Sequence, residues 1–150
     1  MASGSAQMSD ADYFNYISAA ILQAKKLNTS EEAYGRSMRE FDKLFDYSCN
    51  MLRNFPRDER HLTRDDIRKT LAEIRDNLVL VWKSYYKKNT LETIDKFLAV
   101  LRVQISFSCR NNYITTRQEG IWVSHVDNVN AYIKGWKELI KSNPVARLYT

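Results

Sequence analysis

Apolar residues recur at alternating spacings of three and four along four segments of the chain, the period of one face of an α-helix. Before Pro56 this face carries Met38, Phe41, Phe45, Ser48, Leu52 and Phe55. The second segment carries Ile67, Leu71, Ile74, Leu78, Val81 and Tyr85, widened by Trp82. The third carries Leu91, Ile94, Phe97, Leu98, Leu101, Ile105 and Cys109, and the fourth carries Val126, Val129, Ile133, Trp136 and Ile140.

Each segment has residues that favour a helix start before it or a helix stop after it. Side-chain oxygens of Thr or Asn can accept hydrogen bonds from the first free N–H groups of a helix, and a Glu or Gln three residues later completes a capping box. The expected starts are Thr29-x-x-Glu32, Thr63, Asn89-x-x-Glu92 and Thr115-x-x-Gln118. The expected stops are Phe55-Pro56, Asn111-Asn112 and Asn143-Pro144.

Because the connections between these segments are short, neighbouring helices are expected to run antiparallel. The predicted fold is therefore all-α, an up-and-down antiparallel four-helix bundle. Residues 9–27 form a further amphipathic stretch, either an extra N-terminal helix or an extension of the first helix. Residues 1–8 are expected to be a flexible or vector-derived leader, residues 9–142 the bundle domain, and residues 143–150 a C-terminal tail.

The composition is that of one globular helical domain. The chain has 150 residues, 44% of them hydrophobic, with only 4 Gly and 2 Pro, which favours long helices over a sheet. No apolar run approaches the roughly 18 residues of a membrane span, and no signal peptide is recognisable. Cys49 and Cys109 show no metal-type spacing, so we expect a reduced, cytoplasmic protein that does not bind membranes.

The patterns of known active sites are missing from the sequence. There is no inward Glu-x-x-His pair of a carboxylate-bridged metal bundle, no glycine-rich phosphate loop, no nucleophile elbow and no Cys/His cluster. His61 lies in a polar loop, and His125 lies at the edge of the last apolar stripe. We expect no catalytic residue, no metal and no cofactor.

Charge is distributed unevenly along the chain, whose net charge is +5. Residues 1–50 carry 5 Lys or Arg against 7 Asp or Glu, whereas residues 51–150 carry 18 against 11, a net +7. Within the basic part, two helical stripes could contact phosphates. These stripes are Arg64, Arg68 and Arg75, and Lys134, Lys137 and Lys141. The alternative is a solvated face whose cations pair with nearby carboxylates.

Two further residues stand out by their position. Arg102 interrupts the apolar run from Phe97 to Phe107, where an unpaired charge is costly. It therefore needs an acidic partner, a carbonyl group, a subunit interface or a ligand. Trp122 falls beside the main stripe of its helix and is a candidate interface residue.

At this point four short motifs, in order, resemble a known family. The motifs are Phe55-Pro56-x-x-x-Arg60, Leu62-x-x-x-x-Ile67, Leu101-Arg102 and Gly135-Trp136. Across about residues 38–142 the chain resembles the accessory variability determinants of diversity-generating retroelements, which are related to the four-helix-bundle proteins of intervening sequences in 23S rRNA genes. In that family a second arginine can follow four residues after the position of Arg102, where this chain has Ser106. The stretch up to Leu27 has no counterpart in the resemblance.

The resemblance implies a ring-like homopentamer with a basic surface that binds RNA or DNA. It also implies a reverse transcriptase partner and a role in mutagenic copying of a template RNA. The leading hypothesis is thus a non-enzymatic, nucleic-acid-binding accessory subunit, with Arg102 added to the two basic stripes as candidate contacts. The alternative is a helical module that binds only protein. Gly135 is expected to let a neighbouring helix or subunit approach, with Trp136 filling the core.

Overall fold

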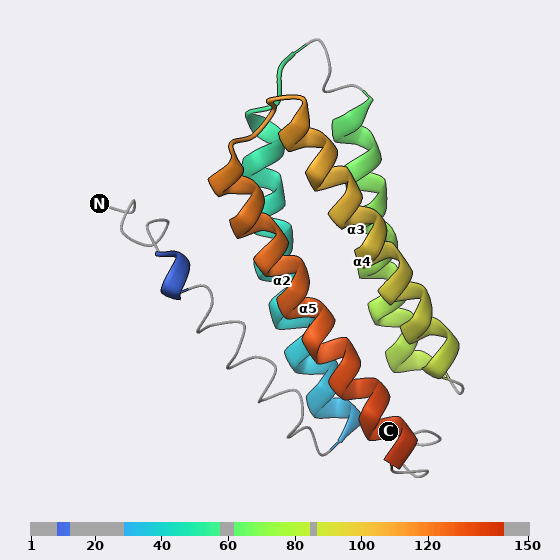
Figure 1. Ribbon diagram of the computed structural model, residues 1–150. Coiled ribbons are helices and arrows are strands. Elements are labelled where there is room, and N and C mark those ends of the chain that lie inside the picture. The colour runs from blue at the N-terminus through green and yellow to red at the C-terminus, as the bar shows by residue number, and fades with distance from the viewer. Residues whose placement is uncertain (1–8, 13–28, 58–61, 85–86, 143–150) are drawn as a thin grey trace.

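The computed structural model describes residues 9–12, 29–57, 62–84 and 87–142. They form four long helices, α2 (Ser30–Arg53), α3 (Thr63–Lys83), α4 (Lys87–Arg110) and α5 (Thr116–Ser142), and no strand occurs in these ranges. Residues 10–12 add a short helical segment, blue in Figure 1. The predicted leader and tail, and residues 13–27 of the N-terminal stretch, lie outside the described residues. The all-α prediction is confirmed.

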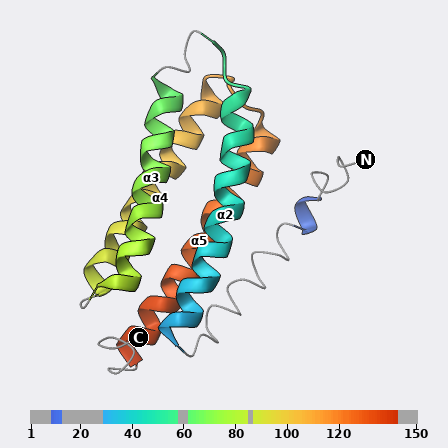
Figure 2. The ribbon, with the colours of Figure 1, turned by 180° about the vertical axis from the view of Figure 1, so that it is seen from behind.

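Each long helix runs antiparallel to the one before it, as the predicted up-and-down bundle requires (Figure 1). The packed pairs are α3 with α4, α2 with α5, α4 with α5, and α2 with α3, in order of decreasing extent. Figures 1 and 2, which view the molecule from opposite sides, both show α2 beside α5 and α3 beside α4. The bundle thus consists of two close helix pairs, and the seam between α2 and α3 is the least extensive.

Within the described ranges the predicted stripes form the core or pack against it, with one exception on α2, whereas the predicted Tyr85 lies outside these ranges. Phe41 and Leu52 are buried as expected, but Phe45 is 36% exposed. The prediction of a core role for Phe45 is wrong because its neighbour Leu44, fully buried, occupies the inward position between Phe41 and Ser48. One residue corresponds to about 100° of helical turn, so the side chain of Phe45 leaves the core at the edge of α2.

Two of the four predicted helix starts are confirmed. The Glu32 N–H donates to Thr29 Oγ1 (3.0 Å), and Thr115 with Gln118 forms a complete capping box through bonds of 2.9 and 3.1 Å. The other two are wrong. Thr63 is already helical and buried, so Leu62 precedes α3 without a side-chain cap.

The third helix begins at Lys87, two residues before the predicted Asn89. The Lys87 ammonium is buried and donates to the Val81 and Ser84 carbonyls (3.1 and 3.0 Å) at the end of α3. The Val81 carbonyl also accepts from the Ser84 N–H (3.2 Å), so the ammonium adds a second donor at the end of α3 and fixes the first turn of α4 against it. Burial lowers the pKa of Lys87 below its usual value. This start was not predicted because the residue that anchors the first turn of α4 is a lysine, which is not a typical N-cap residue.

Asn112 ends α4, as the Asn111-Asn112 pair predicted. Its φ of 62° is the left-handed conformation that Asn tolerates better than most residues. The Asn112 N–H donates to the Cys109 carbonyl (3.0 Å) and the Tyr113 N–H to the Ser108 carbonyl (2.9 Å), which is the pattern of a Schellman motif. The chain then turns so that the Tyr113 ring meets Phe55 (ring centroids 5.3 Å apart).

Two fully buried tryptophans of α5 hydrogen-bond to serines of α2. Trp122 Nε1–H donates to Ser48 Oγ (2.8 Å), and Trp136 Nε1–H donates to Ser30 Oγ (3.3 Å). The interface role suggested for Trp122 is therefore wrong, since the indole lies in the core. A buried indole N–H needs an acceptor, so both serines fix how α2 and α5 align.

Between the two tryptophans, the seam of α2 and α5 is polar. Glu40, only 7% exposed, accepts a hydrogen bond from the amide of Asn128, which is 1% exposed. The other carboxylate oxygen lies 3.4 Å from the Lys43 ammonium. The His125 ring lies against Tyr47, with ring centroids 5.2 Å apart. A charged group is thus buried with two hydrogen-bonding partners, which offset its loss of hydration.

His125 is half-buried at the edge of this seam, as its position in the sequence indicated. Burial is the largest influence and lowers the pKa of His125 below the usual value near 6.5. The Glu40 carboxylate acts in the opposite direction and Lys43 in the same direction, both more weakly. The folded protein therefore binds a proton on this ring less readily than the unfolded chain.

Replacing Trp136 by Ala should lower the free energy of unfolding by about 3–5 kcal/mol, since it removes a large core side chain and leaves the Ser30 hydroxyl without its donor. Urea unfolding followed by circular dichroism, at one protein concentration, measures the change. Trp82→Ala is the matched control, because Trp82 is half-exposed and stacks on Tyr34. Equal losses in the two variants would contradict the core role of Trp136.

Stability should also depend on pH through His125. Because its folded-state pKa is lowered, the stabilisation is complete above the unfolded pKa and is lost as the pH falls from about 6.5 towards the folded-state pKa. The wild type should therefore lose more stability between about pH 7.5 and 5 than His125→Gln does, as measured by urea unfolding at each pH. Parallel pH profiles for the two proteins would show that His125 titrates as it does in the unfolded chain.

Candidate nucleic-acid interface

The three arginines of the first predicted stripe lie along one side of α3. Arg68 and Arg75 are exposed, and Arg64 is half-buried. Arg64 Nε is buried and has no hydrogen-bond partner among the described residues. At about 100° per residue, all three lie within about 40° of Trp82 around the helix. Since the Trp82 ring stacks on Tyr34 of α2 (ring centroids 5.1 Å apart), this arginine row follows the seam between α3 and α2.

Phe45 lies on the α2 side of the same seam. It is about 20° from Tyr34 around α2, so it lies on the flank that faces α3. The two helices are antiparallel with Tyr34 beside Trp82, so Phe45, eleven residues after Tyr34, comes level with Leu71, eleven residues before Trp82. That level lies between Arg68 and Arg75. This register therefore places a partly exposed aromatic ring at the level of the arginine row.

Nearby carboxylates neutralise the arginine row only in part. Arg75 Nε lies 3.1 Å from Asp76 Oδ1, but both side chains are at least half exposed, and such a pair contributes little. The four carboxylates of the helix lie about 60° or more around α3 from the row. They are Asp65, Asp66, Glu73 and Asp76. Within α3 the row thus keeps a basic flank, although the helix as a whole is nearly balanced in charge and α2 exposes Asp42 and Asp46 beside Phe45.

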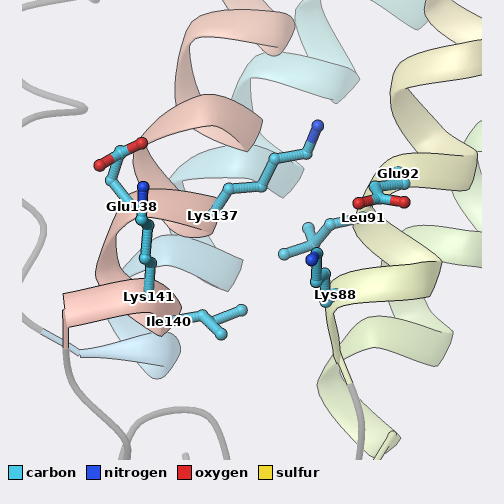
Figure 3. A pocket seen from close by; sticks show the side chains of 7 residues that line it. All are labelled: Lys88, Leu91, Glu92, Lys137, Glu138, Ile140 and Lys141. Atoms are coloured by element: carbon cyan, nitrogen blue, oxygen red, sulfur yellow. The ribbon is translucent and has the colours of Figure 1, made fainter.

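The lysine stripe lies on α5, on the flank that faces α4. Lys137 Nζ is 3.0 Å from Asp95 Oδ2 of α4, while Lys134 and Lys141 are exposed. Lys137 and Lys141 also line a groove of about 390 Å³ between the two helices (Figure 3). Its other lining residues are Lys88, Leu91, Glu92, Glu138 and Ile140. In Figure 3 Leu91 and Ile140 extend towards each other, so the groove has an apolar centre and charges of both signs at its edge.

The structure does not bring the two stripes together. Because α3 and α5 are not among the packed helix pairs, the arginine row and the lysine stripe lie on diagonal helices of the bundle. They form two separate basic surfaces. The arginine row has an aromatic neighbour, whereas the lysine stripe is partly neutralised by Asp95.

Arg102 finds the acidic partner that its position required. Its guanidinium group pairs with Asp127 of α5, and its side chain is 44% exposed at the edge of α4. Ser106, at the position where the resembling family can carry a second arginine, donates to Glu119 Oε2 (3.1 Å). Together with Lys137 and Asp95, these contacts join α4 to α5 along its length. Arg102 is therefore committed to a helix–helix contact in this structure.

The remaining motif residues are mostly structural. Phe55 is buried and meets both Tyr113 and Trp122, whereas Pro56 is exposed. Gly135 and Trp136 are buried on α5. Arg60 and His61 lie outside the described residues.

Sequence reasoning missed two features of these seams. It placed Phe45 in the core and so overlooked an aromatic beside the arginine row. It also passed over Glu40, whose spacing of three from Ser37 and four from Leu44 was the available signal of an inward position. Within the described ranges, no three His, Cys, Asp or Glu side chains are grouped to hold a metal, and no helix has the length and hydropathy of a membrane span.

Comparison with known protein families gives one match. A family model described as bAvd-like matches residues 37–140, more than two thirds of the chain, and spans nearly all of the four described helices. No curated protein and no solved structure matches the chain. The matched range agrees with the resemblance carried by the Phe-Pro, Leu-Arg and Gly-Trp motifs. This chain belongs to the bAvd-like family.

Proposed function

We propose that this protein is a non-enzymatic accessory subunit that binds nucleic acid and works with a reverse transcriptase in the mutagenic copying of a retroelement template. Membership of the bAvd-like family supports the accessory role. We further propose that it acts as a homo-oligomer, specifically the homopentamer that the resemblance implies, and that it is located in the cytoplasm. The single observation that carries the binding function is the arginine row with Phe45 beside it.

This surface suits single-stranded nucleic acid for a physical reason. Guanidinium groups bind phosphates through paired N–H donors, and an exposed aromatic ring stacks on a base of any sequence. The buried Nε–H of Arg64 has no acceptor among the residues that the structure describes, and a movement of this side chain would let a phosphate oxygen supply one. No element typical of base-specific recognition is recognisable in the sequence, so affinity is expected to depend mainly on phosphate contacts.

A second candidate function, a module that binds only protein, is favoured by a different surface. The outward side of α4 exposes Val100, Val103 and Phe107. Exposed apolar side chains in a row on one helix are typical of protein-binding surfaces. Nucleic-acid binding at low salt distinguishes the two candidates, because a module that binds only protein is expected to bind neither RNA nor DNA.

Arg64, Arg68 and Arg75 should together set the salt dependence of binding. For single strands the logarithm of the binding constant falls with the logarithm of salt at about −0.7 per phosphate contact, so replacing all three by Ala should make the slope shallower by about 2. Fluorescence anisotropy with labelled single-stranded RNA and DNA across a salt series measures the slope. The charge-matched control is Arg39→Ala with Lys69→Ala and Lys83→Ala, three exposed cations outside the row.

Phe45→Ala separates stacking from charge in the same assay. It should weaken binding by about 1–3 kcal/mol if one base stacks on the ring, and it should leave the salt slope unchanged.

A triple variant of Lys134, Lys137 and Lys141 tests the other stripe. If that variant alone flattens the slope, the interface lies on α5 instead. Failure of the wild type to bind either nucleic acid at low salt would favour the protein-only module.

The proposed homopentamer has a direct test. Five chains of 17.6 kDa amount to about 88 kDa, which light scattering coupled to size-exclusion chromatography should report. A mass of 17.6 kDa at high micromolar concentration would rule out a stable oligomer. Polymerase or nuclease activity of the isolated protein would contradict the non-enzymatic assignment.

A further inference from the structure

The outward face of α4 differs from the exposed faces of the other described helices. The fractional exposures of Val100, Val103 and Phe107 are 45%, 65% and 42%. The exposed cations of α4 are Lys88, Lys96, Arg102 and Arg110. None of the exposed residues of α4 is an Asp or Glu, since Glu92 and Asp95 are half-buried. By contrast, α2, α3 and α5 each expose at least one carboxylate. An exposed apolar patch with an exposed cation at each end, Lys96 and Arg110, is thus specific to α4 among the described helices, and the half-buried Glu92 lies one step beyond Lys96.

These residues have the spacing of a helix-packing seam. Lys96, Val100, Val103, Phe107 and Arg110 follow one another at intervals of four, three, four and three. This is the spacing of the a and d positions of a coiled coil, where one helix inserts side chains between those of another. The seam is about 21 Å long at 1.5 Å per residue, which corresponds to about two heptads. Its centre is apolar and both ends are cationic.

Two possible occupants fit this seam poorly. A nucleic-acid strand would meet its cations and could stack one base on Phe107, but it would also cover two valines that can neither stack on a base nor hydrogen-bond. A symmetric pairing with α4 of a second copy, centred on Val103, would place Lys96 opposite Arg110 at both ends. Like charges directly opposite each other are destabilising. The proposed ring joins two unlike faces of the chain, so this clash excludes only a pairing of α4 with α4, and the self-association of the Val103→Glu variant tests the other arrangements. A partner that fits this seam must present apolar side chains to its centre and negative charge to both of its ends.

We infer that the outward face of α4 docks an acidic amphipathic helix of a partner protein. The partner presents three apolar side chains to Val100, Val103 and Phe107, with carboxylates facing Lys96 and Arg110. Helix-on-helix docking buries the exposed apolar surface, and the charges at the ends fix its register. This inference does not rest on the nucleic-acid binding proposed above, because it uses none of the arginine row.

The probe is a synthetic, fluorescein-labelled acidic peptide of about three heptads, with Leu at the central seam positions and Glu at the end positions. A permuted peptide of the same composition, without the seam, is its control. Anisotropy titration of the full-length protein at physiological salt should give an affinity at least about tenfold higher for the patterned peptide. Equal affinity for both peptides would overturn the inference, since binding would then reflect charge alone.

Matched variants locate the binding surface. Val103→Glu should weaken binding about tenfold or more, whereas Leu80→Glu on α3, also an exposed apolar position at 53%, should change it less than about twofold. Lys96→Glu with Arg110→Glu should weaken binding, and Lys69→Glu with Lys83→Glu should not. Circular dichroism checks that each variant remains folded. An unchanged affinity in Val103→Glu would overturn the inference, as would loss of self-association in Val103→Glu but not in Leu80→Glu, because a second copy would then occupy the face.

Discussion

The alignment of α2 with α5 depends on two indole N–H groups that the core buries. Trp122 and Trp136 are fully buried, and each donates to a serine of α2. A buried indole N–H without an acceptor would cancel much of the stabilising free energy that burial of the ring contributes. The two bonds lie near opposite ends of the helix pair, so sliding α2 along α5 by one turn would break both. The buried contact between Glu40 and Asn128 lies between them and holds the same register.

The α5 helix connects the two sides of the bundle by different means. Towards α2 it uses buried hydrogen bonds, whereas towards α4 it adds half-exposed ion pairs such as Arg102 with Asp127 and Lys137 with Asp95. Exposed pairs contribute little energy, but they disfavour misaligned packing of two apolar stripes. The pair of α2 and α3 is the least extensively packed of the four neighbouring helix pairs. The arginine row and Phe45 lie along the seam of this pair.

The two proposed surfaces lie on different elements. The arginine row faces the seam of α2 and α3, and the apolar seam with Lys96 and Arg110 runs along the outward side of α4. A strand of nucleic acid and a helix of a partner protein would therefore not compete for the same side chains. Such an arrangement suits an accessory subunit that brings a template to another protein, since each contact can form while the other persists.

The helices and most of the core follow from the amino-acid pattern alone, because a repeat of three and four residues specifies which face of a helix avoids water. The Ile67, Ile94 and Val129 stripes were predictable on this ground, as were the capping box at Thr115 and the stop at Asn112, which depend only on neighbours along the chain. The packing of the four helices, in contrast, places Phe45 outside the core, anchors α4 through Lys87 and buries Glu40 with Asn128. It also places the arginine row and the lysine stripe on diagonal helices. Helical periodicity describes one helix at a time, whereas the burial of a charge or the joining of two stripes depends on which flank each neighbouring helix covers.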